Sequence, residues 1–134
     1  MALEAGLSIE AGFVVDDMVT AATFDGTRLA PVLSTPHLIG FMEGTAHQLV
    51  VKYLDPKQSS VGLSVNIRHL AATPVGMRVR MLVELVEVAG RRLRFKMTAW
   101  DEVDKIAEGE HERYIIDWER FMAGVAKKES GLKI

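Results

Sequence analysis

The sequence contains no cysteine among its 134 residues. This absence excludes disulfides, thiolate nucleophiles and cysteine-based metal sites, and it fits a reducing compartment. Long apolar runs are missing too, because none approaches the roughly 20 residues that a membrane-spanning helix needs. The first 18 residues carry acids and no basic stretch, unlike a secretory signal. We therefore expect a cytoplasmic protein without a membrane partner.

An excess of charge of either sign is missing as well. The formal net charge is −2, and charged residues make up 25% of the chain. This balance gives no indication of a nucleic-acid partner. The four histidines lack the spacing of metal ligands, and the sequence has neither a Gly-rich phosphate loop nor a G-x-S-x-G nucleophile elbow. We expect no metal site, and the length predicts a single domain over residues 1–134.

The longest helical pattern in the chain runs from residue 34 to residue 54. Either Ser34 or Thr35 can cap its first turn, and Pro36 suits the first helical position. Glu43 is the one carboxylate in this stretch, and Gly44 follows it although glycine costs a helix interior about 1 kcal/mol relative to alanine. The apolar residues recur at three- and four-residue steps: Leu38, Ile39, Met42, Ala46, Leu49, Val50 and Tyr53.

Alternating apolar residues predict five strands, at 7–15, 61–71, 77–85, 93–99 and 105–116. Residues 16–33 have no clean period, and 117–128 predict a short helix with Asp117 as its cap. The short connections after residue 61 predict a meander of four antiparallel neighbours. An antiparallel sheet must wrap a single long helix to bury both apolar faces. The sequence therefore predicts an α+β architecture of the kind called a hot-dog fold, with a long central helix wrapped by an antiparallel sheet.

Three polar residues fall at predicted core or near-core positions: Thr35, Glu43 and His69. A hydroxyl, a carboxylate and an imidazole are the groups that acid/base or nucleophilic acyl transfer needs. Each also has a structural interpretation: an N-cap, a solvent-facing carboxylate and a satisfied core histidine. The basic rows on the strands at 77–99 pair with the acids at 108–112 in the simplest interpretation, and a polyanion site is the alternative.

Several stretches resemble the fluoroacetyl-CoA thioesterase family of hot-dog proteins, from about residue 34 to residue 121. They are G-F-M-E at 40–43, R-H-L-A-A-T-P-V-G at 68–76, V-A-G-R-R-L at 88–93 and G-E-H-E-R at 109–113. The resemblance implies a catalytic set of Thr35, Glu43 and His69. It also places the backbone N–H of Gly62 near the thioester carbonyl and Arg113 near the site, as substrate-binding residues.

The resemblance implies an acyl-CoA thioesterase that hydrolyses a short-chain acyl-CoA to the free acid and CoA. CoA is part of the substrate, so no cofactor is expected, and the site would lie at the interface of a homodimer. Glu43 would act as base or as nucleophile, and its charge would raise the pKa of His69. The alternative is a non-catalytic acyl-CoA-binding or regulatory dimer. The segment before Thr35 is shorter than the family's lid and has Leu29 near the place of a lid phenylalanine, so fluoroacetyl selectivity is not implied.

Overall fold

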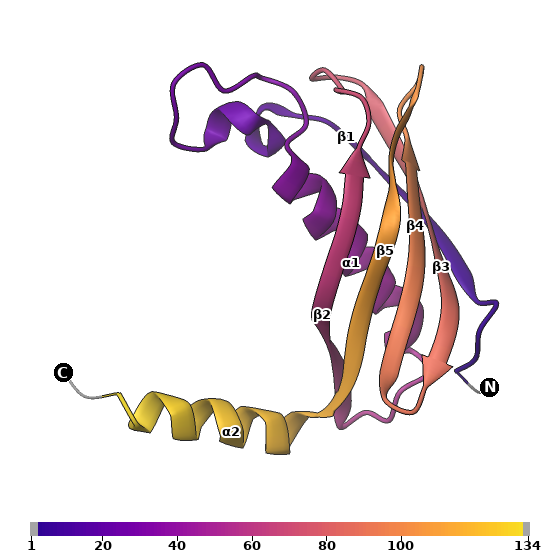
Figure 1. Ribbon diagram of the computed structural model, residues 1–134, viewed down its shortest axis with the longest axis vertical. Helices are drawn as coiled ribbons and strands as arrows, with labels where there is room; N and C mark the ends of the chain where they lie inside the picture. Colours follow the sequence, from indigo (N-terminus) through magenta and orange to yellow (C-terminus); the bar gives the residue numbers. More distant parts are fainter. Residues whose placement is uncertain (1–2, 133–134) are drawn as a thin grey trace.

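The computed structural model describes residues 3–132 (Figure 1). Both predicted helices and all five predicted strands are present, with ends that differ from the expected ones by a few residues. In chain order the elements are β1 (Ser8–Val14), the 3₁₀ turns η1 (Asp17–Val19) and η2 (Ala21–Thr23), α1 (Thr35–Val51), β2 (Gln58–His69), β3 (Arg78–Ala89), β4 (Arg92–Trp100), β5 (Lys105–Asp117) and α2 (Trp118–Ser130).

The five strands form one antiparallel sheet in the order β1-β3-β4-β5-β2. The predicted meander is confirmed for β3, β4 and β5, but it is wrong for β2, which pairs with β5 at the far edge. The connection at 70–77 instead joins β2 to β3 across the first turn of α1. There Leu33 N–H donates to the Thr73 carbonyl over 2.9 Å, and Gly76 N–H donates to the Val15 carbonyl over 2.8 Å.

The core lies between α1 and the curved sheet, and α1 runs along the concave side of the strands in Figure 1. The buried α1 side chains recur at helical spacing, whereas those of β3 and β4 alternate along each strand. The predicted α+β hot-dog architecture is therefore confirmed. The largest fully buried side chains include Leu38, Met42, Leu49, Met81, Leu85, Leu93, Phe95, Met97 and Ile106.

Charged side chains on the outer face pair across neighbouring strands, as the simplest interpretation predicts. Arg94 lies 3.1 Å from Glu110, and Arg92 lies 3.9 Å from Glu112. These pairs connect β4 with β5 diagonally, because Arg94 stands opposite Glu112 and Arg92 opposite Tyr114 in the sheet. The basic rows are thus neutralised by neighbouring acids, which leaves no support for the polyanion alternative.

Strand β2 differs from its predicted pattern. Leu63 was expected to face the core, but it is 49% exposed. The ladder between β2 and β5 shifts register between Gly62 and Ser64, and this irregularity changes which side chains face inward. Within the described chain, β2 also pairs on one side only, so its other edge carries unpaired backbone groups.

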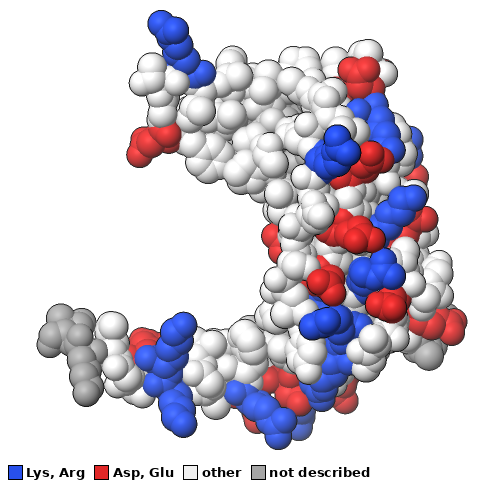
Figure 2. All heavy atoms as spheres, in the orientation of Figure 1, with Lys and Arg blue, Asp and Glu red and all other residues white. Residues whose placement is uncertain are grey.

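Helix α2 runs away from the sheet after β5 (Figure 1), and none of its described residues is buried. Asp117 takes the predicted N-cap position without a side-chain capping bond, and its carboxylate instead lies 3.2 Å from Arg91. In Figure 2 the molecule is hollowed between α2 and the segment at 16–34, while charged side chains gather over the strands. No helix within residues 3–132 has the length and apolar character to cross a membrane.

Candidate functional site

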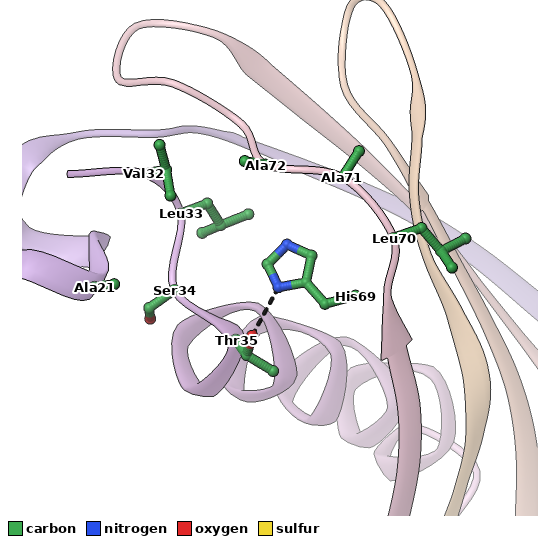
Figure 3. A pocket seen from close by; sticks show the side chains of 9 residues that line it. All are labelled: Ala21, Val32, Leu33, Ser34, Thr35, His69, Leu70, Ala71 and Ala72. Carbon is green, nitrogen blue, oxygen red and sulfur yellow. Dashed lines mark hydrogen bonds between the residues drawn. The ribbon is translucent and has the colours of Figure 1, made fainter. Parts of the chain in front are cut away.

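The hydroxyl of Thr35 lies beside the imidazole of His69. Ser34 is the N-cap of α1, because its Oγ accepts from the backbone N–H of His37 over 3.1 Å. The alternative in which Thr35 caps the helix is therefore wrong. Released from capping, Thr35 Oγ1 lies 2.8 Å from Nδ1 of His69 at the end of β2 (Figure 3). Two residues 34 positions apart in the sequence thus share a hydrogen bond.

The other ring nitrogen of His69 is buried and has no hydrogen-bond partner within residues 3–132. Most buried polar atoms in proteins have a hydrogen-bond partner, so an unpaired one at a cavity indicates a candidate functional group. Burial lowers the pKa of His69, and the backbone of Ala71 opposes this shift to a smaller extent. Within a single chain Glu43 is not among the causes of this shift, so its expected effect on the pKa of His69 stays a prediction. A neutral imidazole with one unpaired nitrogen can accept or deliver a proton there.

Thr35 and His69 line a cavity of about 350 Å³ under the segment that precedes α1 (Figure 3). Small side chains make up much of its wall, so the cavity has room for a short acyl group, and Ser34, Thr35 and His69 contribute polar side chains to it. Its other lining residues are Ala21, Val32, Leu33, Ser34, Leu70, Ala71 and Ala72.

Glu43 lies further along α1, where it meets the middle of β2 and β5. Its Oε2 is 3.7 Å from Nη1 of Arg113 and 4.0 Å from Nε2 of His111, and its side chain is 37% exposed. A Cβ atom added to Gly62 would stand 2.7 Å from the same oxygen. The carboxylate therefore occupies the space that a side chain at position 62 would fill, and this close approach explains the glycine.

The guanidinium of Arg113 is buried and tied on several sides. Its Nε–H donates to Ser60 Oγ over 2.8 Å, and Nη2 donates to the Ser60 carbonyl over 2.9 Å. Its Nη1 lies 3.2 Å from Nε2 of His111. Burial lowers the pKa of Arg113, while the charge of Glu43 raises it. Arg113 therefore lies beside the Glu43 carboxylate, and its role in binding substrate stays a prediction.

Sequence reasoning missed His111 and Ser60 as members of this group. The alternation of the 105–116 stretch had placed His111 opposite the exposed acids, and that signal could have identified a buried histidine. Ser60 precedes the predicted start of its strand, so no pattern pointed to it. His47 on α1 joins the same group, because its Nδ1 lies 2.8 Å from Ser60 Oγ.

Within one chain the five predicted site residues form two separate groups. Thr35 and His69 line one cavity, whereas Glu43 and Arg113 line another beside Gly62. Eight residues separate Thr35 from Glu43 on α1, which corresponds to about 12 Å along the helix axis. A single chain therefore does not bring the three predicted catalytic residues together. No cluster of three His, Asp or Glu side chains suited to a metal ion occurs among residues 3–132.

Comparisons with known proteins identify the family of the chain. The model of the fluoroacetyl-CoA-specific thioesterase family, FlK, matches residues 15–119. The fluoroacetyl-CoA thioesterase of Streptantibioticus cattleyicolor is 40% identical over 97 residues, which cover 72% of this chain and 70% of that protein.

Solved structures agree at the level of the fold. A variant of FlK matches with 33% identity and a TM-score of 0.89, over 96% of this chain and 98% of that one. A complex of the variant with fluoroacetate and CoA matches with 33% identity and a TM-score of 0.84, over 89% of this chain and 99% of that one. A thioesterase superfamily member from Thermus thermophilus shares the fold. It matches with 23% identity and a TM-score of 0.86, over 97% of this chain and 95% of that one. Sequence, fold and family model agree, and the chain belongs to the fluoroacetyl-CoA-specific thioesterase family.

Proposed function

We propose that this protein hydrolyses short-chain acyl-CoA thioesters to the free acid and CoA. The observation that carries the proposal is the 2.8 Å contact between Thr35 Oγ1 and His69 Nδ1 at a small cavity, with the second imidazole nitrogen buried and unpaired. The printed activity of the 40% identical relative supports the same reaction. Leu29 does not line this cavity, so fluoroacetyl selectivity is not part of the proposal.

The site is completed by a second copy of the chain, so the active species is a homodimer. In a dimer with a two-fold axis, the β2 strands of the two chains lie antiparallel to each other, and so do the two α1 helices. Such an axis can place the end of α1 that carries Thr35 opposite the Glu43 region of the partner. The same axis places the His69 end of β2 opposite Gly62. Each site then takes its hydroxyl and imidazole from one chain and its carboxylate from the other.

Several surface features favour this pairing. The outer edge of β2 is unpaired in the described chain and exposes Leu63, which suits addition of a second β2 strand. On α1, Gly40 and Gly44 have no described atoms within 4 Å of an added Cβ, so another helix can approach closely. The hollow beside β2 in Figure 2 provides room for the partner. An unpaired edge and an open helix face on one side of a molecule are typical of an interface.

The reaction balances with these groups alone. Glu43 takes a proton from water, the water oxygen bonds to the thioester carbonyl carbon, and the C–S bond breaks. The proton reaches the departing sulfur through His69, giving the acid and the CoA thiol. Thr35 orients the imidazole or donates to the carbonyl oxygen, and the backbone N–H of Gly62 faces the developing oxyanion. In the second version Glu43 attacks the carbonyl itself and expels the CoA thiolate, and water then opens the resulting anhydride. Label found in the Glu43 carboxyl after a single turnover in ¹⁸O-water would establish this version, because general-base hydrolysis leaves that carboxyl unlabelled.

A complementation experiment tests the reaction and the shared site together. We expect Glu43→Gln and His69→Ala homodimers each to lose at least about 10²-fold in kcat/KM, the scale of a lost acid/base group. Chains carrying Thr35→Ala and Glu43→Gln are then co-expressed with different affinity tags, and the heterodimer is isolated. One of its two sites is intact, so about half of the wild-type activity should return. A thiol reagent follows CoA release over a panel of acyl-CoAs.

The matched control pairs Thr35→Ala with His69→Ala, which damage the same half of the site. Both sites of that heterodimer remain defective, so its activity should stay low. Recovery in neither heterodimer would contradict the shared site. Wild-type protein that binds acyl-CoA without releasing thiol across the panel would contradict the hydrolase and favour the non-catalytic binder.

A further inference from the structure

His111 is a fully buried histidine to which the proposed reaction gives no role. It lies on β5, its ring packs against Phe95 with centroids 5.9 Å apart, and its exposed fraction is 0%. Burying an imidazole is costly unless both of its nitrogens find partners. Both nitrogens of His111 have partners, and its Nε2 also lies 4.0 Å from Oε2 of Glu43.

The partners of His111 fix its protonation state. Its Nδ1 lies 2.8 Å from the Ser64 carbonyl oxygen, which can only accept, so Nδ1 carries the proton. Its Nε2 lies 3.2 Å from Nη1 of Arg113, which can only donate, so Nε2 carries a lone pair. The ring is therefore neutral and is held in one tautomer. Burial lowers the pKa of His111, and this shift favours the same neutral form.

Arg113 links His111 to the carboxylate. Ser60 holds the Nε and Nη2 side of the guanidinium, and His111 holds Nη1, the nitrogen that lies 3.7 Å from Glu43 Oε2. If the lone pair of His111 were removed, Nη1 would lose the acceptor that fixes its direction. Ser60 alone would then hold the guanidinium, which could tilt about its two bonds to Ser60 and carry Nη1 away from the carboxylate of Glu43.

We propose that His111 is a positioning residue, whose Nε2 lone pair holds Arg113 facing Glu43 and thereby fixes the carboxylate for hydrolysis. This inference rests on the proposed function, because it assumes that Glu43 acts on the thioester. In this proposal Arg113 binds the carboxylate of Glu43 and not the acyl group of the substrate. It also gives the buried Ser60 a role, as the second anchor of the guanidinium.

The tautomer of His111 provides a test on the wild-type protein itself, with a variant used only to assign the signal. In ¹⁵N-histidine protein, two-bond nitrogen–proton spectra distinguish the two neutral tautomers from the charged ring, and His111→Gln assigns the signal. We expect His111 to carry its proton on Nδ1 throughout the pH range of activity. A ring protonated on Nε2, whether neutral or charged, would overturn the proposal, because it could not accept from Arg113.

A double-mutant cycle tests the link to Glu43. His111→Phe keeps an aromatic ring beside Phe95 and removes the lone pair, and it should lower kcat about 10- to 100-fold with KM unchanged, as for a misplaced catalytic group. His111→Gln can present an oxygen acceptor and should recover part of the loss. In the Glu43→Gln background, His111→Phe should cost nothing further. Denaturant unfolding of each variant confirms that it is folded.

The outcomes separate the two ideas. If Glu43→Gln alone leaves hydrolysis unchanged, the proposed function fails. If Glu43→Gln is impaired and His111→Phe causes the same loss in both backgrounds, the proposed function stands and His111 is merely structural. Should His111→Phe not fold, the tautomer in the wild-type protein and the His111→Gln cycle decide the question.

Discussion

Replacing Gly62 by alanine should lower activity strongly while leaving the fold intact. The new Cβ would stand 2.7 Å from Glu43 Oε2, whereas ordinary van der Waals contact begins at 3.4 Å. Its next neighbours, His111 Cε1 at 3.5 Å and Arg113 Nη1 at 3.6 Å, are already at ordinary contact distances. The conflict therefore falls on one flexible carboxylate end, and relief requires Glu43 to move by more than half an ångström.

The Gly62→Ala substitution should change stability much less than activity. Turning Glu43 away from its rotamer costs about 0.5–1.5 kcal/mol. Replacing glycine by alanine at a compatible backbone returns about 0.4–1 kcal/mol by restricting the unfolded chain. The free energy of unfolding should thus change little. A catalytic group misplaced by about 1 Å can lose 10²-fold in rate, so kcat/KM should fall by about 10- to 100-fold.

The assay is CoA release from acetyl-CoA with a thiol reagent, alongside urea unfolding of the same samples. Gly124→Ala is the matched control, because this residue lies in α2 and has no described atom within 4 Å of an added Cβ. It should keep wild-type activity. A folded Gly62→Ala protein with undiminished kcat/KM would refute the reasoning, since the position of the carboxylate would then not matter.

Two further predictions concern stability. Burial lowers the pKa of His47, His69 and His111 below the usual 6.5, so the unfolded chain binds more protons than the native one in the window below 6.5. The free energy of unfolding, measured in urea, should therefore be highest above pH 6.5 and fall as the pH drops through the native pKa values; a level profile would contradict this. Phe95→Ala should cost about 3–5 kcal/mol because the ring is fully buried. Val103→Ala, at a side chain 76% exposed, should stay within about 0.5 kcal/mol, and equal losses would disprove the assigned core.

Local patterns explain why most elements could be predicted. The helix at 34–54 and the strands repeat their apolar residues with periods set by backbone geometry, so a short window of sequence contains the signal. Ser34 shows the limit of such a signal, because two adjacent hydroxyls fit the cap equally well. Only the backbone conformation decided that Ser34 caps α1 and that Thr35 is free to reach His69.

The order of the strands could not be read in the same way. Neighbouring strands in a sheet are chosen by packing between distant segments, and the short connection at 70–77 suggested that β2 and β3 lie side by side. The sheet instead curves around α1, and the connection at 70–77 passes from β2 at one edge to β3, which lies beside the opposite edge strand β1. Curvature of a whole sheet is a collective property that no local window contains.

The sequence by itself determined which side chains are candidates for the chemistry. Alternation placed His69 inside, helical spacing placed Glu43 on α1, and resemblance added Gly62 and Arg113. Tertiary structure alone decided how these residues group, with His69 against Thr35 and Glu43 against Gly62 and Arg113. The reason is that periodicity fixes which face of an element a residue occupies. The partner across that face is set by the distance between elements, and this distance exists only in the folded protein.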